Sequence, residues 1–129
     1  MIAIDTNVLV RLLVSDNHAQ SKASHMLFAA EDIFIPDTVL LETEWVLRAA
    51  FELSPADICT ALRRVCGLSN VTVSDGQRVA QVIDWHEMGF DFADAFHLAL
   101  GKEKNSLKTF DVDFIKKAKK YTDLRVEQP

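Results

Sequence analysis

The sequence contains little of what marks a fibrous, disulfide-stabilised or membrane-spanning protein. Among its 129 residues are four glycines, three prolines and two cysteines, too few for a collagen-like repeat, a flexible linker or a disulfide framework. No run approaches the roughly 20 consecutive apolar residues that cross a bilayer. Asp5 and Arg11 interrupt the apolar N-terminal stretch and no basic segment precedes it, which argues against a secretory signal peptide. We expect one domain, residues 1–129, without a membrane segment.

The net charge also argues against one class of protein. Fourteen basic and 19 acidic residues give a net charge of −5, a sign that repels nucleic acid and argues against a protein that coats DNA or RNA. That conclusion changes if several acids surround bound cations. Cys59 and Cys66 lie seven residues apart in a helical pattern, which favours buried thiols in a reducing cytoplasm.

Short strand-like runs alternate with longer helical patterns. The strand-like runs are 1–5, 33–36, 70–74, 106–111 and 124–128. The helical patterns are a short one after Asn7 and then 18–31, 37–52, 55–67, 76–88, 92–104 and 112–120. Strands separated by helices of this length are joined by parallel crossovers. The pattern therefore predicts an α/β fold, a three-layer α/β/α sandwich with a mainly parallel central sheet.

Residues with known preferences for helix ends support these limits. Thr6 or Asn7 is suited to cap the first helix, and Asp37 or Thr38 to cap the helix over 37–52. Gly89 is expected to end the helix over 76–88.

Two strand-like runs end in aspartate. Ligands of parallel sheets bind beyond the carboxyl ends of the strands, and Asp5 and Asp111 both stand at such ends. We therefore expect both carboxylates at the same edge of the sheet. Asp113 follows two residues later, and a cap for the helix over 112–120 is the alternative role of either Asp111 or Asp113. Thr109 precedes Asp111 by two residues, so its hydroxyl is expected on the same side.

Two glutamates fall on the helix over 37–52. On a helical wheel, Glu44 lies beside Arg48 four residues on, which predicts an exposed ion pair. Glu42 lies among Trp45 and Val46, where an ionised carboxylate is costly unless it is paired or bound to metal. The alternative for Glu42 is a charge at the helix edge that reaches solvent.

Two more acids share one face of an otherwise apolar helix. Asp91 and Asp94 are three residues apart in GFDFADAFHLAL, and a largely buried helix has little solvent face for them. Asp94 is interpreted as a ligand and Asp91 as a supporting acid, with an N-cap as the alternative for Asp91. His97 is interpreted as a residue at the edge of the core rather than a ligand.

Together, Asp5, Glu42, Asp94 and Asp111 form a set of carboxylates in otherwise apolar elements. Ligands that are all oxygen select hard cations such as Mg²⁺ or Mn²⁺, and close carboxylates do not all stay ionised without cations between them. The chemistry that uses such a set is hydrolysis of a phosphodiester by metal-activated water.

Four motifs in order, IDTN, LLETEWVL, DFADAFHLAL and TFDVDF, resemble those of PIN-domain nucleases, and within them most closely the VapC toxins of bacterial and archaeal toxin–antitoxin pairs. The resemblance covers essentially the whole chain. It implies a divalent-metal-dependent endoribonuclease that acts as a toxin on an RNA substrate. It also implies a cognate antitoxin as partner and a homodimer.

The resemblance also assigns residues. It places the acidic quartet of the family on Asp5, Glu42, Asp94 and Asp111, auxiliary acids on Asp91 and Asp113, and supporting polar residues on Thr6, Asn7 and Thr109. Lys108 departs from the pattern, because relatives generally have a small or apolar residue there. This leaves the burial of the second face of that strand open, and a phosphate contact is a possible role for Lys108.

Two other functions remain open on the sequence alone. A receiver-type phosphoacceptor domain is also α/β with acids at strand ends, but it has no use for Glu42 or for Asp91 and Asp94. A catalytically silent PIN-fold module that binds RNA or protein needs no intact quartet. The lysine run Lys116, Lys117, Lys119 and Lys120 either steers phosphates or forms a solvated helix face.

Overall fold

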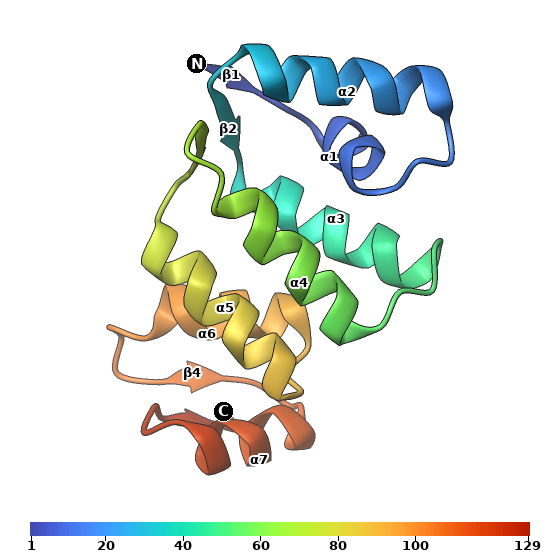
Figure 1. The fold of residues 1–129 in the computed structure, drawn as a ribbon. Helices are drawn as coiled ribbons and strands as arrows, with labels where there is room; N and C mark the ends of the chain where they lie inside the picture. The colour runs from blue at the N-terminus through green and yellow to red at the C-terminus, as the bar shows by residue number, and fades with distance from the viewer.

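The computed structural model describes all 129 residues and contains seven helices and five strands (Figure 1). The helices are α1 (Thr6–Leu13), α2 (His18–Ala30), α3 (Asp37–Ala49), α4 (Pro55–Cys66), α5 (Gly76–Met88), α6 (Phe92–Gly101) and α7 (Val112–Tyr121). The strands are β1 (Ile2–Ala3), β2 (Ile33–Ile35), β3 (Val71–Val73), β4 (Leu107–Lys108) and β5 (Val126–Glu127). Every predicted helix and strand is present in the predicted order. The α/β sandwich with parallel strands is thereby confirmed.

The strands are divided between two sheets. The first has the order β1-β2-β3 and the second contains only β4 and β5, with all pairs parallel. In the first sheet Ile2 lies opposite Ile33, and in the second Leu107 lies opposite Val126. β1 and β4 are therefore both edge strands, where the sequence predicts one central sheet. Periodicity specifies that a segment is a strand, but it does not specify which strand pairs with it.

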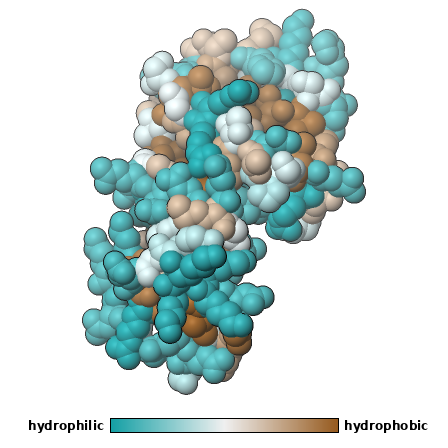
Figure 2. Space-filling view, turned by 60° about the horizontal axis from the view of Figure 1, so that its bottom comes forward, coloured by the Kyte–Doolittle hydropathy of each residue, from teal (hydrophilic) through white to brown (hydrophobic).

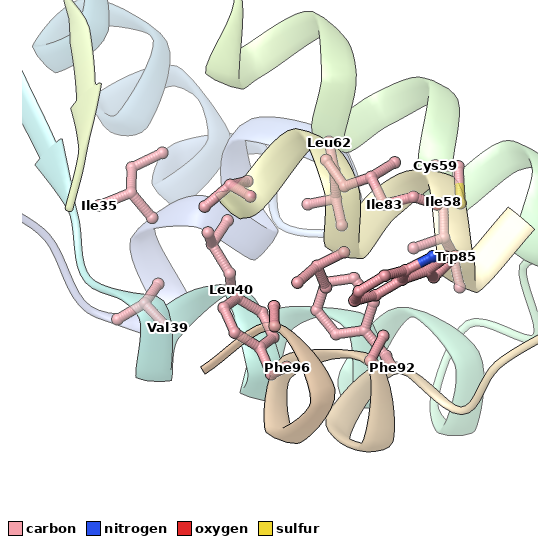
Figure 3. Close-up of a cluster of buried hydrophobic side chains, with 14 of the residues drawn as sticks. Ile35, Val39, Leu40, Ile58, Cys59, Leu62, Ile83, Trp85, Phe92 and Phe96 are labelled. Carbon is pink, nitrogen blue, oxygen red and sulfur yellow. Dashed lines mark hydrogen bonds between the residues drawn. The ribbon is translucent and has the colours of Figure 1, made fainter. Parts of the chain in front are cut away.

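The main hydrophobic core lies between the first sheet and helices α1 to α6. Ile33 and Ile35 of β2 are buried and Phe34 between them is half-buried, as the alternation of side chains along a strand requires. In Figure 3 the side chains of Ile35 and Leu40 lie in one cluster with Phe96 of α6. This core fixes α3 and α6 relative to each other, and these two helices carry Glu42 and Asp94.

We call the last part of the chain, β4, α7 and β5, the C-terminal unit, and its buried side chains belong to the same hydrophobic cluster as the main core. Its inner side chains Phe114 and Ala118 are buried, and the ring of Phe90 packs edge-on against Phe114 with centroids 6.2 Å apart. Figure 1 places α7 at the opposite end of the molecule from the N-terminus. The space-filling view shows a larger and a smaller lobe joined by a narrow waist (Figure 2).

Two of the predicted helix caps are wrong. Asp5, not Thr6 or Asn7, is the N-cap of α1, because its backbone is extended and its carboxylate accepts from the Val8 N–H. Pro36 occupies the N-cap position of α3 without a side-chain bond. Asp37 is then the first helical residue, and its carboxylate pairs with Arg78 instead, at 3.1 Å.

Other sequence expectations agree with the structure. Gly89 ends α5 with a φ of 115°, a conformation that a side chain strongly disfavours. Cys59 is buried and Cys66 half-buried, and both are free thiols. Burial raises the pKa of Cys66 to about 11, so this thiol stays protonated at neutral pH. None of the helices is long and apolar enough to cross a membrane.

The packing of Leu40 leads to a stability prediction. Leu40 is 0% exposed, so Leu40→Ala is expected to lower the free energy of unfolding by about 2–5 kcal/mol through the cavity it leaves. Leu100 is 56% exposed, so Leu100→Ala is expected to change it by less than about 0.5 kcal/mol. Urea unfolding of both variants measures the difference. Equal losses would contradict the position of the core described here.

Candidate metal and nuclease site

The predicted site acids line three clefts. Asp5 and Glu42 line a cleft of about 450 Å³ between α1 and α3, together with Thr6 and Asn7. Glu42 also lines a second cleft, which Asp91 borders from the start of α6. Thus Glu42 stands between the first helix and the acids of the second half of the chain.

The third cleft contains most of the remaining acids. It measures about 180 Å³ and is lined by Asp91, Asp94, Asp111 and Asp113, with Lys117 beside them. The structure therefore brings four predicted site aspartates together from α6 and α7. It does not bring them together with Asp5, because β1 and β4 belong to different sheets.

Two properties of these acids bear on metal binding, the chemistry of their donor atoms and their arrangement in space. Carboxylate oxygens are the ligands that Mg²⁺ and Mn²⁺ prefer. In this conformation, however, no group of three or more acidic, histidine or cysteine side chains is arranged to hold a metal ion. The residue types fit a divalent cation, and their arrangement in this conformation does not.

Three of the acids cap helices. The Oδ1 atoms of Asp5, Asp91 and Asp111 accept backbone N–H groups of α1, α6 and α7 at 3.2, 3.0 and 3.0 Å. Each bond fixes the carboxylate and leaves Oδ2 outside the cap bond. The cap predicted as the alternative role of Asp91 is present. The alternative for Asp113 is wrong, because Asp111 caps α7 and Asp113 lies in its first turn.

Thr109 holds the backbone that carries Asp111. Its hydroxyl oxygen accepts the N–H of Asp111 at 3.0 Å, a local turn that threonine readily forms. The carboxylate of Asp111 is thus fixed from two sides, by the Phe114 N–H and by the backbone position that Thr109 imposes.

Asp94 lies in an electrostatically unfavourable position. Burial raises the pKa of its carboxyl above the ordinary value, and the negative charges of Asp91 and Asp111 raise it further. His97 and Lys117 lower this pKa by smaller amounts. This cleft therefore has a surplus of negative charge, which a bound cation would relieve.

Of the two glutamates of α3, Glu44 contradicts the sequence prediction, and Glu42 has the solvent-exposed position that was its alternative. Glu44, predicted to be exposed, is 3% exposed, and its carboxylate accepts from Arg48 Nε at 2.9 Å. His86 Nε2 lies 3.7 Å from the same oxygen. Glu42 is the exposed one, beside an exposed Trp45.

The spacing of Glu44 relative to the leucines of α3 indicates that it is buried. Leu40, Glu44 and Leu47 follow the i, i+4, i+7 spacing of a single helix face, and all three are buried. The pair between Glu44 and Arg48 was predicted correctly. The wheel does not predict its burial, because the apolar Trp45 and Val46 indicate a different inward face.

Two residues outside the acidic set have clear positions. His97 is exposed on α6. Lys108 lies on β4, where its ammonium pairs with Glu127 of β5. Its side chain is half-exposed, so this face of the strand is not buried.

The PIN domain family matches residues 2–120 of the sequence. The chain belongs to the PIN domain family. A solved structure of VapC20 from Mycobacterium tuberculosis, described as a toxin that cleaves the sarcin-ricin loop, is similar to this PIN domain. The two chains are 20% identical, 88% of this chain and 92% of that one are covered, and the TM-score is 0.44. Among curated proteins, no relative matches the sequence.

The two glutamates of α3 lead to a paired prediction. Glu44→Gln is expected to lower the free energy of unfolding by about 1.5–3 kcal/mol, because it weakens a partly buried charge-assisted hydrogen bond to Arg48. Glu42→Gln, two residues away and exposed, is expected to leave stability within about 0.5 kcal/mol. Chemical unfolding of both variants in EDTA tests this. A larger loss for Glu42→Gln would show that the faces of α3 are assigned wrongly.

The crowding at Asp94 leads to a pH prediction. Its pKa in the folded chain is raised, so the folded state holds this proton more tightly than the unfolded state does. The contribution of Asp94 to stability therefore falls as the pH rises through the raised pKa. Asp94→Asn is expected to melt at a higher temperature than wild type at neutral pH in EDTA.

This difference is expected to shrink as the pH falls through the raised pKa, since wild-type Asp94 then becomes neutral as well. Thermal melts of both proteins from neutral to acidic pH measure it, with the exposed Asp123→Asn as control. A lower melting temperature for Asp94→Asn at neutral pH would contradict the proposed repulsion.

Proposed function

We propose that this PIN domain is a divalent-metal-dependent endoribonuclease and the toxin of a toxin–antitoxin pair. One observation carries the proposal: in a chain of this family, four aspartates from the N-terminal turns of α6 and α7 and the residues just before them line one cleft. A structural role alone does not account for like charges gathered in this way, because they destabilise one another.

The proposed ligands of Mg²⁺ or Mn²⁺ are Asp5, Glu42, Asp94 and Asp111, with Asp91 and Asp113 as auxiliary acids. A divalent ion in such a site lowers the pKa of a bound water and stabilises charge on the phosphate. The work of this chain is to hold the carboxylates in place. The caps on Asp5 and Asp111 support that role, because each leaves one oxygen outside the cap bond.

Other polar residues have supporting roles in the proposal. Thr6 and Asn7 line the cleft of Asp5 and Glu42, and Thr109 positions Asp111. Lys117 borders the cleft of Asp94 and Asp111, where its positive charge favours the approach of an RNA phosphate.

The proposal includes partners and location. An antitoxin protein is the proposed inhibitor, a homodimer the proposed assembly, and the cytoplasm the proposed compartment. The catalytically silent PIN module is the competing function.

Cleavage of total cellular RNA tests the proposal. Wild type is expected to produce discrete fragments with Mg²⁺ or Mn²⁺ and none in EDTA. Asp5→Asn is expected to lower the rate by roughly 100-fold or more, as loss of one preorganised charged group typically does. Asp123→Asn, an exposed aspartate outside the clefts, serves as the matched control and is expected to cleave like wild type.

Full activity of Asp5→Asn with a verified metal requirement would refute the assignment of the site. No cleavage by folded, antitoxin-free wild type with either metal would favour the silent binding module.

A further inference from the structure

The cleft between α3 and the start of α6 contains residues that the proposed set of metal ligands does not use. Its volume is about 460 Å³, which is within the range of sites that hold a small ligand such as one nucleotide. Trp45 is the only aromatic residue that lines it, and Arg48 is the only cation. Glu42 and Asp91 also line it, so the cleft adjoins the proposed metal ligands.

Trp45 is unusually exposed for a tryptophan. It is 58% exposed, whereas Trp85, the other tryptophan of the chain, is 6% exposed. Tryptophan is highly buried on average, and an apolar ring in water contributes little to the stability of the fold. Trp45 follows Glu42 by three residues, so the two side chains are neighbours on the surface of α3. An RNA strand whose phosphate reaches Glu42 therefore passes the indole ring.

Arg48 is held at this cleft by the buried Glu44. Its Nε donates to Glu44 Oε2 at 2.9 Å, and its Nη2 lies 3.5 Å from Oε1. The side chain of Glu44 is 4% exposed and that of Arg48 is 46% exposed. The carboxylate thus fixes one edge of the guanidinium, while Nη1 donates to nothing in the chain. A guanidinium fixed in this way loses little further freedom when it binds a phosphate.

The charges in the cleft decide when a phosphate is able to bind there. The bond to Glu44 is the main cause of the raised pKa of Arg48, and the negative charge of Asp91 contributes to it. Without a metal ion, Glu42 and Asp91 leave the cleft with more negative than positive charge and repel a phosphate. A divalent cation on Glu42 reverses this balance. Binding of RNA at this cleft is therefore expected to require a divalent cation.

We propose that this cleft is a nucleotide subsite for single-stranded RNA, in which the base stacks on Trp45 and the phosphate binds Arg48. Glu44 is a positioning residue that acts through Arg48. A base inside a duplex already stacks on its neighbours, so the contact with Trp45 selects unpaired RNA. The subsite rests on the proposed function and adds to it the form of RNA that the site accepts.

Tryptophan fluorescence tests the base contact directly. In Trp85→Phe the emission comes from Trp45 alone. A short single-stranded RNA is expected to quench it saturably in the presence of Ca²⁺, which carboxylate oxygens also bind, and a gel verifies that the RNA stays intact. The same RNA annealed to its complement is expected to quench the emission much less, because its bases are not free to stack on the ring.

The affinity of variants for the same RNA gives a second test. Trp45→Leu is expected to bind about 5- to 150-fold more weakly in Ca²⁺, the range that corresponds to loss of one stack between a base and an aromatic ring. Trp45→Phe, which keeps an aromatic ring, is expected to retain most of the affinity. If Trp85→Phe does not fold, this comparison decides the base contact alone.

The phosphate contact is tested by the dependence of affinity on salt. Arg48→Gln is expected to reduce the slope of log affinity against log salt by about 0.7, as loss of one phosphate contact to a single strand does. Arg64→Gln, which removes an exposed arginine outside this cleft, serves as the matched control and is expected to leave the slope unchanged. An unchanged slope for Arg48→Gln would overturn the phosphate contact.

The role of Glu44 is tested by combining two substitutions. Glu44→Gln is expected to weaken RNA binding in the wild-type background but to have no further effect on binding in Arg48→Gln, because it acts through that guanidinium. Circular dichroism verifies that each protein is folded. An equal loss of affinity in both backgrounds would show that Glu44 does not act through Arg48.

Several outcomes would overturn the subsite. They are Trp45 emission that stays constant while RNA binds, Trp45→Leu that binds like wild type, and folded wild type that binds no RNA in Ca²⁺. Emission that changes with protein concentration in the absence of RNA would instead assign this face to a contact between copies of the chain, and would also overturn it.

Failure of the subsite and failure of the proposed function give different results. A chain that cleaves RNA while Trp45→Leu binds like wild type would overturn the subsite and leave the nuclease standing. A chain that binds RNA through Trp45 but cleaves none with Mg²⁺ or Mn²⁺ would support the subsite and count against the nuclease.

Discussion

The cap that an aspartate makes with the next helix is the interaction on which the acidic clefts depend. At Asp5, Asp91 and Asp111 one carboxylate oxygen accepts the backbone N–H three residues on. A cap of this kind stabilises a helix by about 1 kcal/mol, so each of these aspartates stabilises the folded chain. The same bond fixes where the second oxygen points. Capping and ligand binding, which compete as explanations of an aspartate at a strand end, are therefore compatible roles of one side chain.

The second constraint is the packing around Phe90. This ring is buried at the junction between α5 and α6 and contacts both Phe114 and Tyr121 of α7. Gly89 before it has a φ of 115°, which turns the chain sharply and exposes its carbonyl to Lys117. These local contacts decide where the C-terminal unit lies, and with it which carboxylates Asp111 approaches.

Periodicity was sufficient to predict the order of helices and strands, because burial on one face of each element is a local property of the sequence. The partners of each strand were not predictable, since the pairing of β4 with β5 alone depends on contacts such as Phe90 with Phe114. For α3 the wheel predicted the pairing of Glu44 with Arg48, but a wheel does not state which side faces the core. Glu44 is buried because Leu40 and Leu47 on its face contact the core, and Arg48 compensates its charge.

The division of the acids has an electrostatic reason. Asp94 already carries a raised pKa from its burial and from its neighbours Asp91 and Asp111, so adding Asp5 and Glu42 to the same space without a cation would increase the repulsion. A metal-free chain is therefore more stable with its acids apart, and a cation that binds only the assembled set stabilises the assembled state by mass action. Metal binding and assembly of the acids would thus strengthen each other, and by linkage each favours the other to the same extent.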